Sequence, residues 1–251
     1  MKKGLTVVIL LIALTLGLAG CGQESSEKLI VGTEPTFPPF EYQDEETKEI
    51  VGFDIELIKA IAEEAGYEVE IQNLGFDGLI GALKSGNIDV IMSGMTITPE
   101  REEEVDFGTP YFDAGLMVAV PTDNTTINSV DDLDGKSVAV QIGTTGAEKA
   151  EELKEAGLVK EVKTFDTMDA VFLELLNGTV DAVINDKPVN EVFMAKNPGK
   201  IKMVGDILDG EQYGFAVASG ETELLEKLNE GLEKVKASGK YDELKAKYFG
   251  E

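Results

Sequence analysis

Short apolar runs typical of strands alternate along this chain with longer segments whose apolar residues recur at helical spacing. Residues 28–33, 68–71 and 88–92 have the strand pattern, and residues 54–65 form an amphipathic helix. A further helix is predicted between the second and third of these strands. Strands that alternate with helices pair mainly in parallel, and the helices cover the sheet. The sequence therefore predicts an α/β fold.

One helix–turn–strand unit occurs twice. Residues 85–92 (SGNIDVIM) resemble residues 177–184 (NGTVDAVI), and the two copies are offset by 92 positions. That offset is too long for a solenoid repeat and fits two lobes built alike. A strand at 115–120 lacks a following helix, and a turn at 209–212 separates two further strands. The chain is expected to cross between the lobes at these two places.

The segment 93–101 (SGMTITPER) follows the first copy and contains Arg101, the only arginine in the chain. Thr98 and Pro99 supply an N-cap and a first-turn proline for a helix predicted through Val105, so Arg101 lies in its first turn. The planar guanidinium suits bidentate binding of a carboxylate, and a helix N-terminus favours the same anion. The alternative is a surface arginine paired with neighbouring glutamates.

Asn185-Asp186 follows the second copy as Ser93-Gly94 follows the first. If the lobes are built alike, Asp186 lies at the matching mouth of the second lobe and faces the arginine across a cleft. A cation and an anion placed in this way fit the two charges of a zwitterion. The alternative for Asp186 is an N-cap of the helix that starts at the following Lys-Pro pair.

The chain opens with two lysines and an apolar run, residues 5–18, that ends in Leu-Ala-Gly-Cys21. The run is short for a membrane span and predicts a secretory signal over residues 1–20. Its ending resembles a bacterial lipobox, in which cleavage precedes the cysteine and that cysteine receives a lipid. Cys21 is the only cysteine, which excludes an intramolecular disulfide. Residues 21–27 are then a lipid-anchored tether on the outer face of the cell membrane, in the periplasm where the host has an outer membrane.

Acidic residues outnumber basic residues by 48 to 22, and histidine is absent. This balance argues against nucleic acid as a partner, because phosphate binding needs clustered Lys and Arg. The loop 141–146 (QIGTTG) lies between a strand and a helix, but it lacks the lysine of a phosphate-binding loop and the spacing of a dinucleotide fingerprint. No cofactor and no metal are predicted.

Several separated motifs together resemble one family, the polar amino-acid-binding proteins of bacterial ABC importers, which are family 3 extracellular solute-binding proteins. The resemblance implies a type II periplasmic-binding-protein fold, with two α/β lobes, each a mainly parallel sheet flanked by helices, and a two-strand hinge. One lobe then comprises 28–114 and 211–251, and the other comprises 115–210. The motifs are the lipobox, 31–40 (VGTEPTFPPF), 52–54 (GFD), 93–101, 131–135 (DDLDG), 141–146, 185–186 and the ending 239–249.

The resemblance also assigns roles to residues in the cleft. Arg101 and the backbone N–H groups of Thr96 and Thr145 would hold a ligand α-carboxylate. Asp186, the Gly94 carbonyl and the Thr96 hydroxyl would hold the α-ammonium group. Phe37 and Phe76 would enclose the ligand side chain. The remaining candidates are the lining residues Ser93, Gln141 and Thr144, Glu34 toward the far end of the ligand, and the further candidates Asp54 and Asn185; Asp54 has an alternative role as a helix N-cap.

The resemblance implies capture of one L-amino acid by hinge closure and delivery to an ABC permease, by a monomer that is not an enzyme. Glutamine-binding relatives tend to carry Lys at the position of Gln141 and His at that of Asn185, whereas both are neutral amides here. Because no cation stands there and Glu34 offers a carboxylate, arginine ranks first, glutamine second, and lysine or histidine third. Two alternatives are a cyclohexadienyl (prephenate or arogenate) dehydratase with Glu34 as general acid, and a tethered amino-acid sensor.

Overall fold

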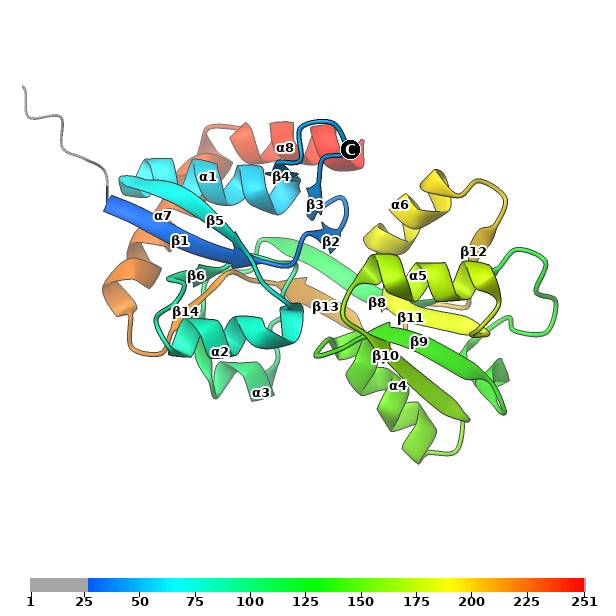
Figure 1. The fold of residues 1–251 in the computed structure, drawn as a ribbon. Coiled ribbons are helices and arrows are strands. Elements are labelled where there is room, and N and C mark those ends of the chain that lie inside the picture. Colours follow the sequence, from blue (N-terminus) through cyan, green and yellow to red (C-terminus); the bar gives the residue numbers. More distant parts are fainter. Residues whose placement is uncertain (1–26, 251) are drawn as a thin grey trace, which may run out of the picture.

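Two separate sheets organise the chain in the computed structural model, which describes residues 27–250 (Figure 1). The first is a five-stranded sheet with the order β5-β1-β6-β14-β7. Its strand β1 runs parallel to β5 and β6, whereas β14 is antiparallel to β6 and β7. Its strands are β1 (Glu27–Thr33), β5 (Tyr67–Asn73), β6 (Val90–Ile91), β7 (Val105–Phe107) and β14 (Ala216–Ala218).

The helices of the first lobe come from both ends of the chain (Figure 1). The helices are α1 (Phe53–Ala65), α2 (Leu79–Lys84), α3 (Pro99–Glu102), α7 (Thr222–Ala237) and α8 (Lys240–Phe249), with a 3₁₀ turn η1 (Phe76–Gly78) and a small antiparallel sheet of β2 (Thr36–Phe37), β3 (Glu41–Gln43) and β4 (Ile50–Val51). The inner face of α1 is fully buried at Leu57, Ile58 and Ile61, and α7 is fully buried at Leu228 and Leu232.

The second lobe has its own sheet, with the order β10-β9-β11-β8-β12. Strand β9 runs parallel to β10 and β11, and β8 is antiparallel to β11 and β12. Its strands are β8 (Phe112–Pro121), β9 (Ser137–Gln141), β10 (Glu161–Phe165), β11 (Ala182–Asp186) and β12 (Ile201–Val204), and its helices are η2 (Val130–Leu133), α4 (Thr145–Glu155), α5 (Met168–Asn177) and α6 (Lys187–Lys196).

Two strands connect the lobes. The first part of β8 pairs antiparallel with β13 (Gly210–Tyr213), so that Phe112 lies opposite Tyr213 and Gly115 opposite Gly210. The chain leaves the first lobe along β8 and returns along β13 (Figure 1). The predicted α/β fold of two lobes with a two-strand hinge is thereby confirmed. The predicted lobe boundaries, after residues 114 and 210, lie in these two strands and stay a prediction.

The repeated unit has the same local structure in both lobes. Each copy ends a helix at a glycine in the left-handed conformation, Gly86 with φ 72° and Gly178 with φ 73°. The aspartate that follows then accepts a hydrogen bond from the neighbouring parallel strand. Asp89 accepts from the N–H of Ile30, and Asp181 accepts from the N–H of Ser137, both at 2.8 Å. The sequence similarity therefore reflects two equivalent strand entries.

One predicted helix is shorter than expected. The helix predicted through Val105 ends at Glu102, and Val105 begins β7. Val105 lies opposite Ala218 in the sheet, and its side chain is buried there. Residues 105–107 therefore pair with β14 as a strand and do not extend the helix.

None of the helices between residues 27 and 250 is long and apolar enough to cross a membrane. The predicted signal over residues 1–20, the lipidated Cys21 and nearly all of the 21–27 tether lie outside the described residues.

Candidate functional site

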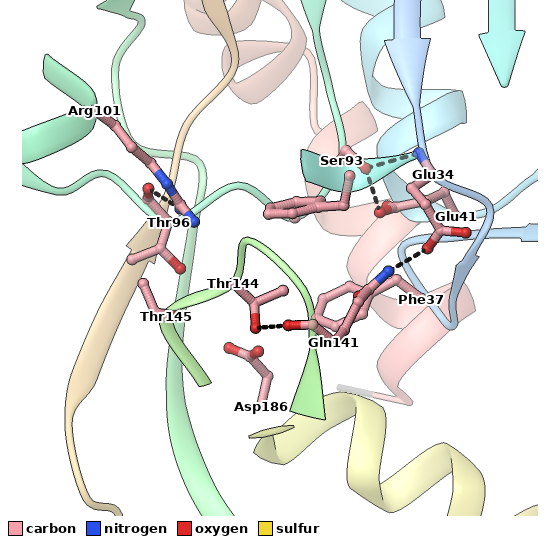
Figure 2. A pocket seen from close by; sticks show the side chains of 12 residues that line it. Glu34, Phe37, Glu41, Ser93, Thr96, Arg101, Gln141, Thr144, Thr145 and Asp186 are labelled. Carbon is pink, nitrogen blue, oxygen red and sulfur yellow. Dashed lines mark hydrogen bonds between the residues drawn. The ribbon is translucent and has the colours of Figure 1, made fainter. Parts of the chain in front are cut away.

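A pocket between the two lobes collects the predicted site residues (Figure 2). Twelve residues line this pocket, and eleven of them are the principal candidates from the sequence. The twelfth, Glu41, was not among them. The first lobe contributes Glu34, Phe37, Glu41, Phe76, Ser93, Gly94, Thr96 and Arg101, and the second contributes Gln141, Thr144, Thr145 and Asp186.

Arg101 is held at one end of the pocket with its guanidinium buried. Thr98 caps α3, because its hydroxyl accepts the N–H of Arg101 at 3.3 Å, and Pro99 occupies the first turn as predicted. The side chain is only 7 % exposed. One guanidinium nitrogen donates to the Thr96 carbonyl at 2.7 Å and the other to the Gly143 carbonyl of the second lobe at 3.0 Å.

The surface-pair alternative for Arg101 is therefore wrong. Between residues 27 and 250, no carboxylate lies within ion-pair distance of its guanidinium, which instead lies 5.5 Å from the centre of the Phe76 ring. Burial lowers the pKa of Arg101, but a guanidinium stays charged in proteins. A fixed cation without a paired carboxylate is suited to binding an anion.

The N-terminus of α4 faces the pocket from the second lobe. Thr144 is its N-cap, and its hydroxyl accepts the N–H of Ala147 at 3.1 Å. Thr145 is the first helical residue and lines the pocket beside Thr144. The unpaired N–H groups and partial positive charge of this helix end add to the charge of Arg101. The two lobes therefore supply a shared anion-binding end of the pocket.

Asp186 provides the opposite charge from the second lobe. It ends β11 and is 6 % exposed, and its Oδ1 has no hydrogen-bond partner among the described residues. Although it occupies the N-cap position of α6, its side chain makes no capping hydrogen bond. Burial raises the pKa of Asp186, whereas the nearby Arg101 lowers it. The geometry thus favours a carboxylate that faces the pocket over a helix cap.

A second acid, Glu211 on hinge strand β13, stands beside Asp186. It is buried, and its Oε2 is also without a partner among residues 27–250. Burial and the neighbouring Asp186 raise the pKa of Glu211 to about 9. Two buried carboxylates this close cannot both be ionised at low cost, so Glu211 carries the proton at neutral pH and Asp186 carries the charge.

The aromatic side chains Phe37 and Phe76 form walls of the pocket. Phe37 is packed against Gly94, which has a positive φ of 50°. A Cβ atom at Gly94 would lie 2.8 Å from the Phe37 ring, so both the backbone and the space there require glycine. Phe40, three residues along, is fully buried among Phe53, Phe112 and Tyr213 and belongs to the core, not to the pocket.

Direct hydrogen bonds join the lobes at the other end of the pocket. The Gln141 side-chain amide donates to Glu34 Oε2 at 2.9 Å (Figure 2). The same oxygen accepts the Thr36 hydroxyl at 2.7 Å. The N–H of Met168 at the start of α5 donates to the Thr36 hydroxyl at 3.0 Å. Burial raises the pKa of Glu34, although these hydrogen bonds oppose the shift. The described structure is therefore a closed arrangement of the lobes.

Glu41 was missed because its burial depends on distant residues. It opens β3 within Phe40-Glu41-Tyr42, and nothing in that triplet distinguishes it from the other acids of the chain. Its side chain is fully buried, and the Ser93 hydroxyl donates to its Oε1 at 3.0 Å. Ser93 in turn accepts the N–H of Glu34, also at 3.0 Å. The only local signal is its position directly after the predicted cleft loop.

The two further candidates, Asp54 and Asn185, do not line the pocket. Adjacent strand residues point to opposite faces, so Asn185 turns away from the cleft that Asp186 faces and donates to Asn190 at 3.2 Å. Asp54 lies behind the pocket wall, where it accepts the N–H of Gly94 at 2.8 Å and the Tyr111 hydroxyl at 2.6 Å. Asp54 is not an N-cap either, since α1 is preceded by Gly52 in that position.

The fold and this pocket are those of a two-lobed solute-binding protein, with groups of both charges facing a small cavity between the lobes. The sequence model of the bacterial extracellular solute-binding proteins, family 3, matches residues 29–251. The chain therefore belongs to this family.

Individual relatives extend this assignment. The arginine-binding extracellular protein ArtP of Bacillus subtilis is 38 % identical over 257 residues, covering 99 % of this chain and 98 % of ArtP. A solved structure of an ancestral arginine-binding protein bound to arginine is 47 % identical, with a TM-score of 0.85, covering 88 % of this chain and 98 % of the other. A structure of an ancestral arginine-binding protein bound to glutamine is 48 % identical, with a TM-score of 0.84, covering 89 % and 98 %. All three are binding proteins.

Proposed function

We propose that this protein binds L-arginine between its lobes and delivers it to an ABC permease. The observation that carries the proposal is the set of charges around the pocket. Its lining contains one basic side chain, Arg101, and three acidic ones, Glu34, Glu41 and Asp186. Arginine has one negative and two positive charges, so each ligand charge has an opposite charge in the pocket.

The ligand orientation follows from the two ends of the pocket. The α-carboxylate would lie against Arg101 and the N-terminus of α4, and the α-ammonium group against Asp186. The guanidinium would extend between Phe37 and Phe76 toward Glu34 and Glu41. An aromatic face attracts a cation, and the guanidinium would give both acids a partner of opposite charge. The names of the relatives support arginine first, glutamine second, and lysine or histidine third.

Signal cleavage before Cys21 would leave a lipid-anchored monomer on the outer face of the cell membrane, with lobes divided after residues 114 and 210. Closure around β8 and β13 would present both lobes to the permease. We infer that the protein is not an enzyme, because a dehydratase has no need of both Arg101 and Asp186 as an amino-acid clamp. A tethered sensor would bind the same ligand and differ only in its partner.

A ligand series with single chemical changes tests the site. We expect L-arginine to raise the melting temperature of the mature protein most, since a ligand at one hundred times its Kd adds about 2.7 kcal/mol of stability. Agmatine lacks the α-carboxylate and should bind at least 100-fold more weakly in calorimetry. L-Citrulline keeps the shape of arginine without its side-chain charge and should be intermediate. Turnover of prephenate or arogenate, with no binding of any amino acid, would contradict the proposal.

A further inference from the structure

A buried pair of acids, Glu41 in the pocket lining and Asp54 behind it, is not used to bind the charged groups that all amino acids share. Glu41 lines the pocket and is fully buried, and its Oε2 has no hydrogen-bond partner among residues 27–250. Asp54 lies behind it on α1 and is also fully buried. Its Oδ1 likewise has no hydrogen-bond partner among these residues. Two successive residues hold the two carboxyl groups near each other, because the Ser93 hydroxyl donates to Glu41 at 3.0 Å and the N–H of Gly94 donates to Asp54 at 2.8 Å. Each carboxyl group also influences the pKa of the other.

A shared proton accounts for both unpaired oxygens. Two adjacent buried carboxylates repel each other, so one of them retains its proton. A proton on Glu41 can be donated to Asp54, which satisfies one oxygen of each group. Burial raises the pKa of Glu41 well above its ordinary value, and that of Asp54 to about 6.

The hydrogen bonds identify which acid holds the proton. Asp54 accepts two donors, the N–H of Gly94 and the hydroxyl of Tyr111, and both stabilise its ionised form. Within the described part of the chain, Glu41 accepts a hydrogen bond only from the Ser93 hydroxyl. The proton therefore resides on Glu41, the member that faces the pocket.

Among residues 27–250, no basic group faces Glu41 to favour its ionised form. The titratable groups that face it are Asp54 from α1, Glu34 from the loop after β1 and Tyr111 from the segment before β8. Arg101 is the one basic residue of the pocket lining, and it lies at the opposite end (Figure 2). A cation next to Glu41 would have to come from the ligand.

We propose that Glu41 is a specificity-determining residue that releases its proton when a cationic ligand side chain arrives and keeps it when the side chain is neutral. With arginine, the O–H bond of Glu41 breaks, its proton passes to solvent, and the carboxylate pairs with the guanidinium. With a neutral side chain, Glu41 keeps the proton that it donates to Asp54, so the pocket wall beside the ligand side chain stays uncharged. This inference rests on the proposed function, because it needs an amino acid in the pocket.

Binding of arginine releases up to one proton more than binding of L-citrulline, which has a similar shape and no side-chain charge. By linkage, the ratio of the two affinities then rises with pH, by up to tenfold per pH unit below the pKa of Glu41. The Asp186–Glu211 pair meets the same α-ammonium group in both ligands, so it does not contribute to the difference.

Calorimetry of the mature protein in buffers with different ionisation enthalpies counts the released protons. Equal proton release with arginine and citrulline in the wild-type protein would overturn the inference. If the wild-type protein binds neither ligand, the proposed function fails and this inference fails with it. If both ligands bind and release equal numbers of protons, only this inference fails.

Two variants assign the proton to the pair. In Glu41→Gln, the difference in proton release should disappear, and arginine affinity should fall by at least tenfold more than citrulline affinity. If the difference persists in Glu41→Gln, the proton comes from another acid such as Glu34, and the inference is wrong. Asp54→Asn should act in the opposite way, because an amide behind Glu41 can donate to its carboxylate and keep it ionised. Arginine should then bind with no extra proton release and at least as tightly as to wild type at pH 6; an unchanged proton count in this variant would also contradict the inference.

Discussion

A pair of buried acids, one protonated and one ionised, lies at each end of the pocket. The protonated acid faces the ligand at one end, and the ionised acid faces it at the other. In the first lobe, the protonated acid Glu41 lines the pocket, and the ionised Asp54 lies behind it. At the lobe junction, the ionised acid Asp186 lines the pocket, and Glu211 with its raised pKa lies behind it. The groups next to each pair determine which of its two acids is ionised. Backbone and phenol donors stabilise the charge of Asp54, whereas Arg101 favours the charge of Asp186.

This difference matches the chemistry of the proposed ligands. Every amino acid has an α-ammonium group, so a permanent charge at Asp186 suits all of them. Side chains differ in charge, and the charge of Glu41, which faces the side-chain end of the pocket, depends on the ligand. A permanent pair of unshielded charges at Glu41 and Glu34 would make the site costly to close around any neutral side chain. The comparison therefore separates residues that recognise the amino-acid group from residues that choose among side chains.

The largest expected effect is at the anion-binding end. Arg101→Ala should weaken arginine binding by at least 100-fold, or about 3 kcal/mol, because the ligand carboxylate would be buried without its partner. Arg101→Lys is the matched control. It keeps the charge but cannot bond both the Thr96 and Gly143 carbonyls while holding a carboxylate, so we expect an intermediate loss. Calorimetry measures both, and an affinity within threefold of wild type in Arg101→Ala would refute the site.

The permanent charge at Asp186 should come next. Asp186→Asn keeps the shape and removes the charge, and we expect arginine and citrulline affinities to fall together by about 30-fold, or roughly 2 kcal/mol. Asn185→Ala is the neighbouring control, since its side chain faces away from the pocket and bonds Asn190. It should lower the melting temperature of the unliganded protein and leave affinity within threefold. A larger loss of arginine than of citrulline affinity in Asp186→Asn would contradict the division of roles.

Residues that directly follow a strand are the part of the site that the sequence predicts. Phe37, Arg101 and Asp186 each follow a strand predicted at the cleft. Their placement at the cleft therefore follows from local structure. The sequence assigns Asp186 to the ligand and retains Asn185 as a further candidate, although the alternation of a strand allows only one of them to face the pocket. In the structure Asp186 lines the pocket and Asn185 does not.

The residues that sequence analysis missed depend on contacts between distant segments. Glu41 and Glu211 are two acids among 48, and their burial requires packing against α1 and the second lobe. The edge strand β10 was also not predicted, because its five residues show only a short alternation. The early end of α3 has the same kind of cause, since β14 is more than one hundred residues away from Val105. Local patterns do not contain this information.

A smaller effect is expected from a cation at the variable end. Gln141→Lys would place an ammonium group beside Glu34, where the glutamine amide now donates at 2.9 Å. The lysine would neutralise Glu34 and repel a guanidinium, so arginine affinity should fall by about tenfold, or 1.4 kcal/mol. Citrulline and glutamine should change by less. Competition calorimetry with the three ligands gives the ratios, and an equal change for all three would show that Glu34 does not face the ligand side chain.

The smallest effect on arginine binding is expected from substitution of Glu211. The same substitution tests most clearly which acid of the Asp186–Glu211 pair holds the proton. At pH 7 this acid is protonated in the folded protein, so Glu211→Gln should leave arginine affinity within about threefold of wild type. Stability should respond more. Between its ordinary value of 4.5 and its raised pKa of about 9, the folded state keeps a proton that the unfolded state has lost. The unfolding free energy therefore falls as pH rises through this range, by about 1.4 kcal/mol per pH unit for one retained proton.

Removal of this proton should change the pH dependence of stability. Urea unfolding of the unliganded protein at pH 5, 7 and 8.5 should show a shallower decline in Glu211→Gln than in wild type, with the two curves diverging as pH rises. The other buried acids remain in both proteins, so the difference between the curves belongs to the Asp186–Glu211 pair. Parallel curves would mean that Glu211 is ionised in the folded state. Asp186 and Glu211 would then both be charged, and the two ends of the pocket would no longer differ in which acid faces the ligand.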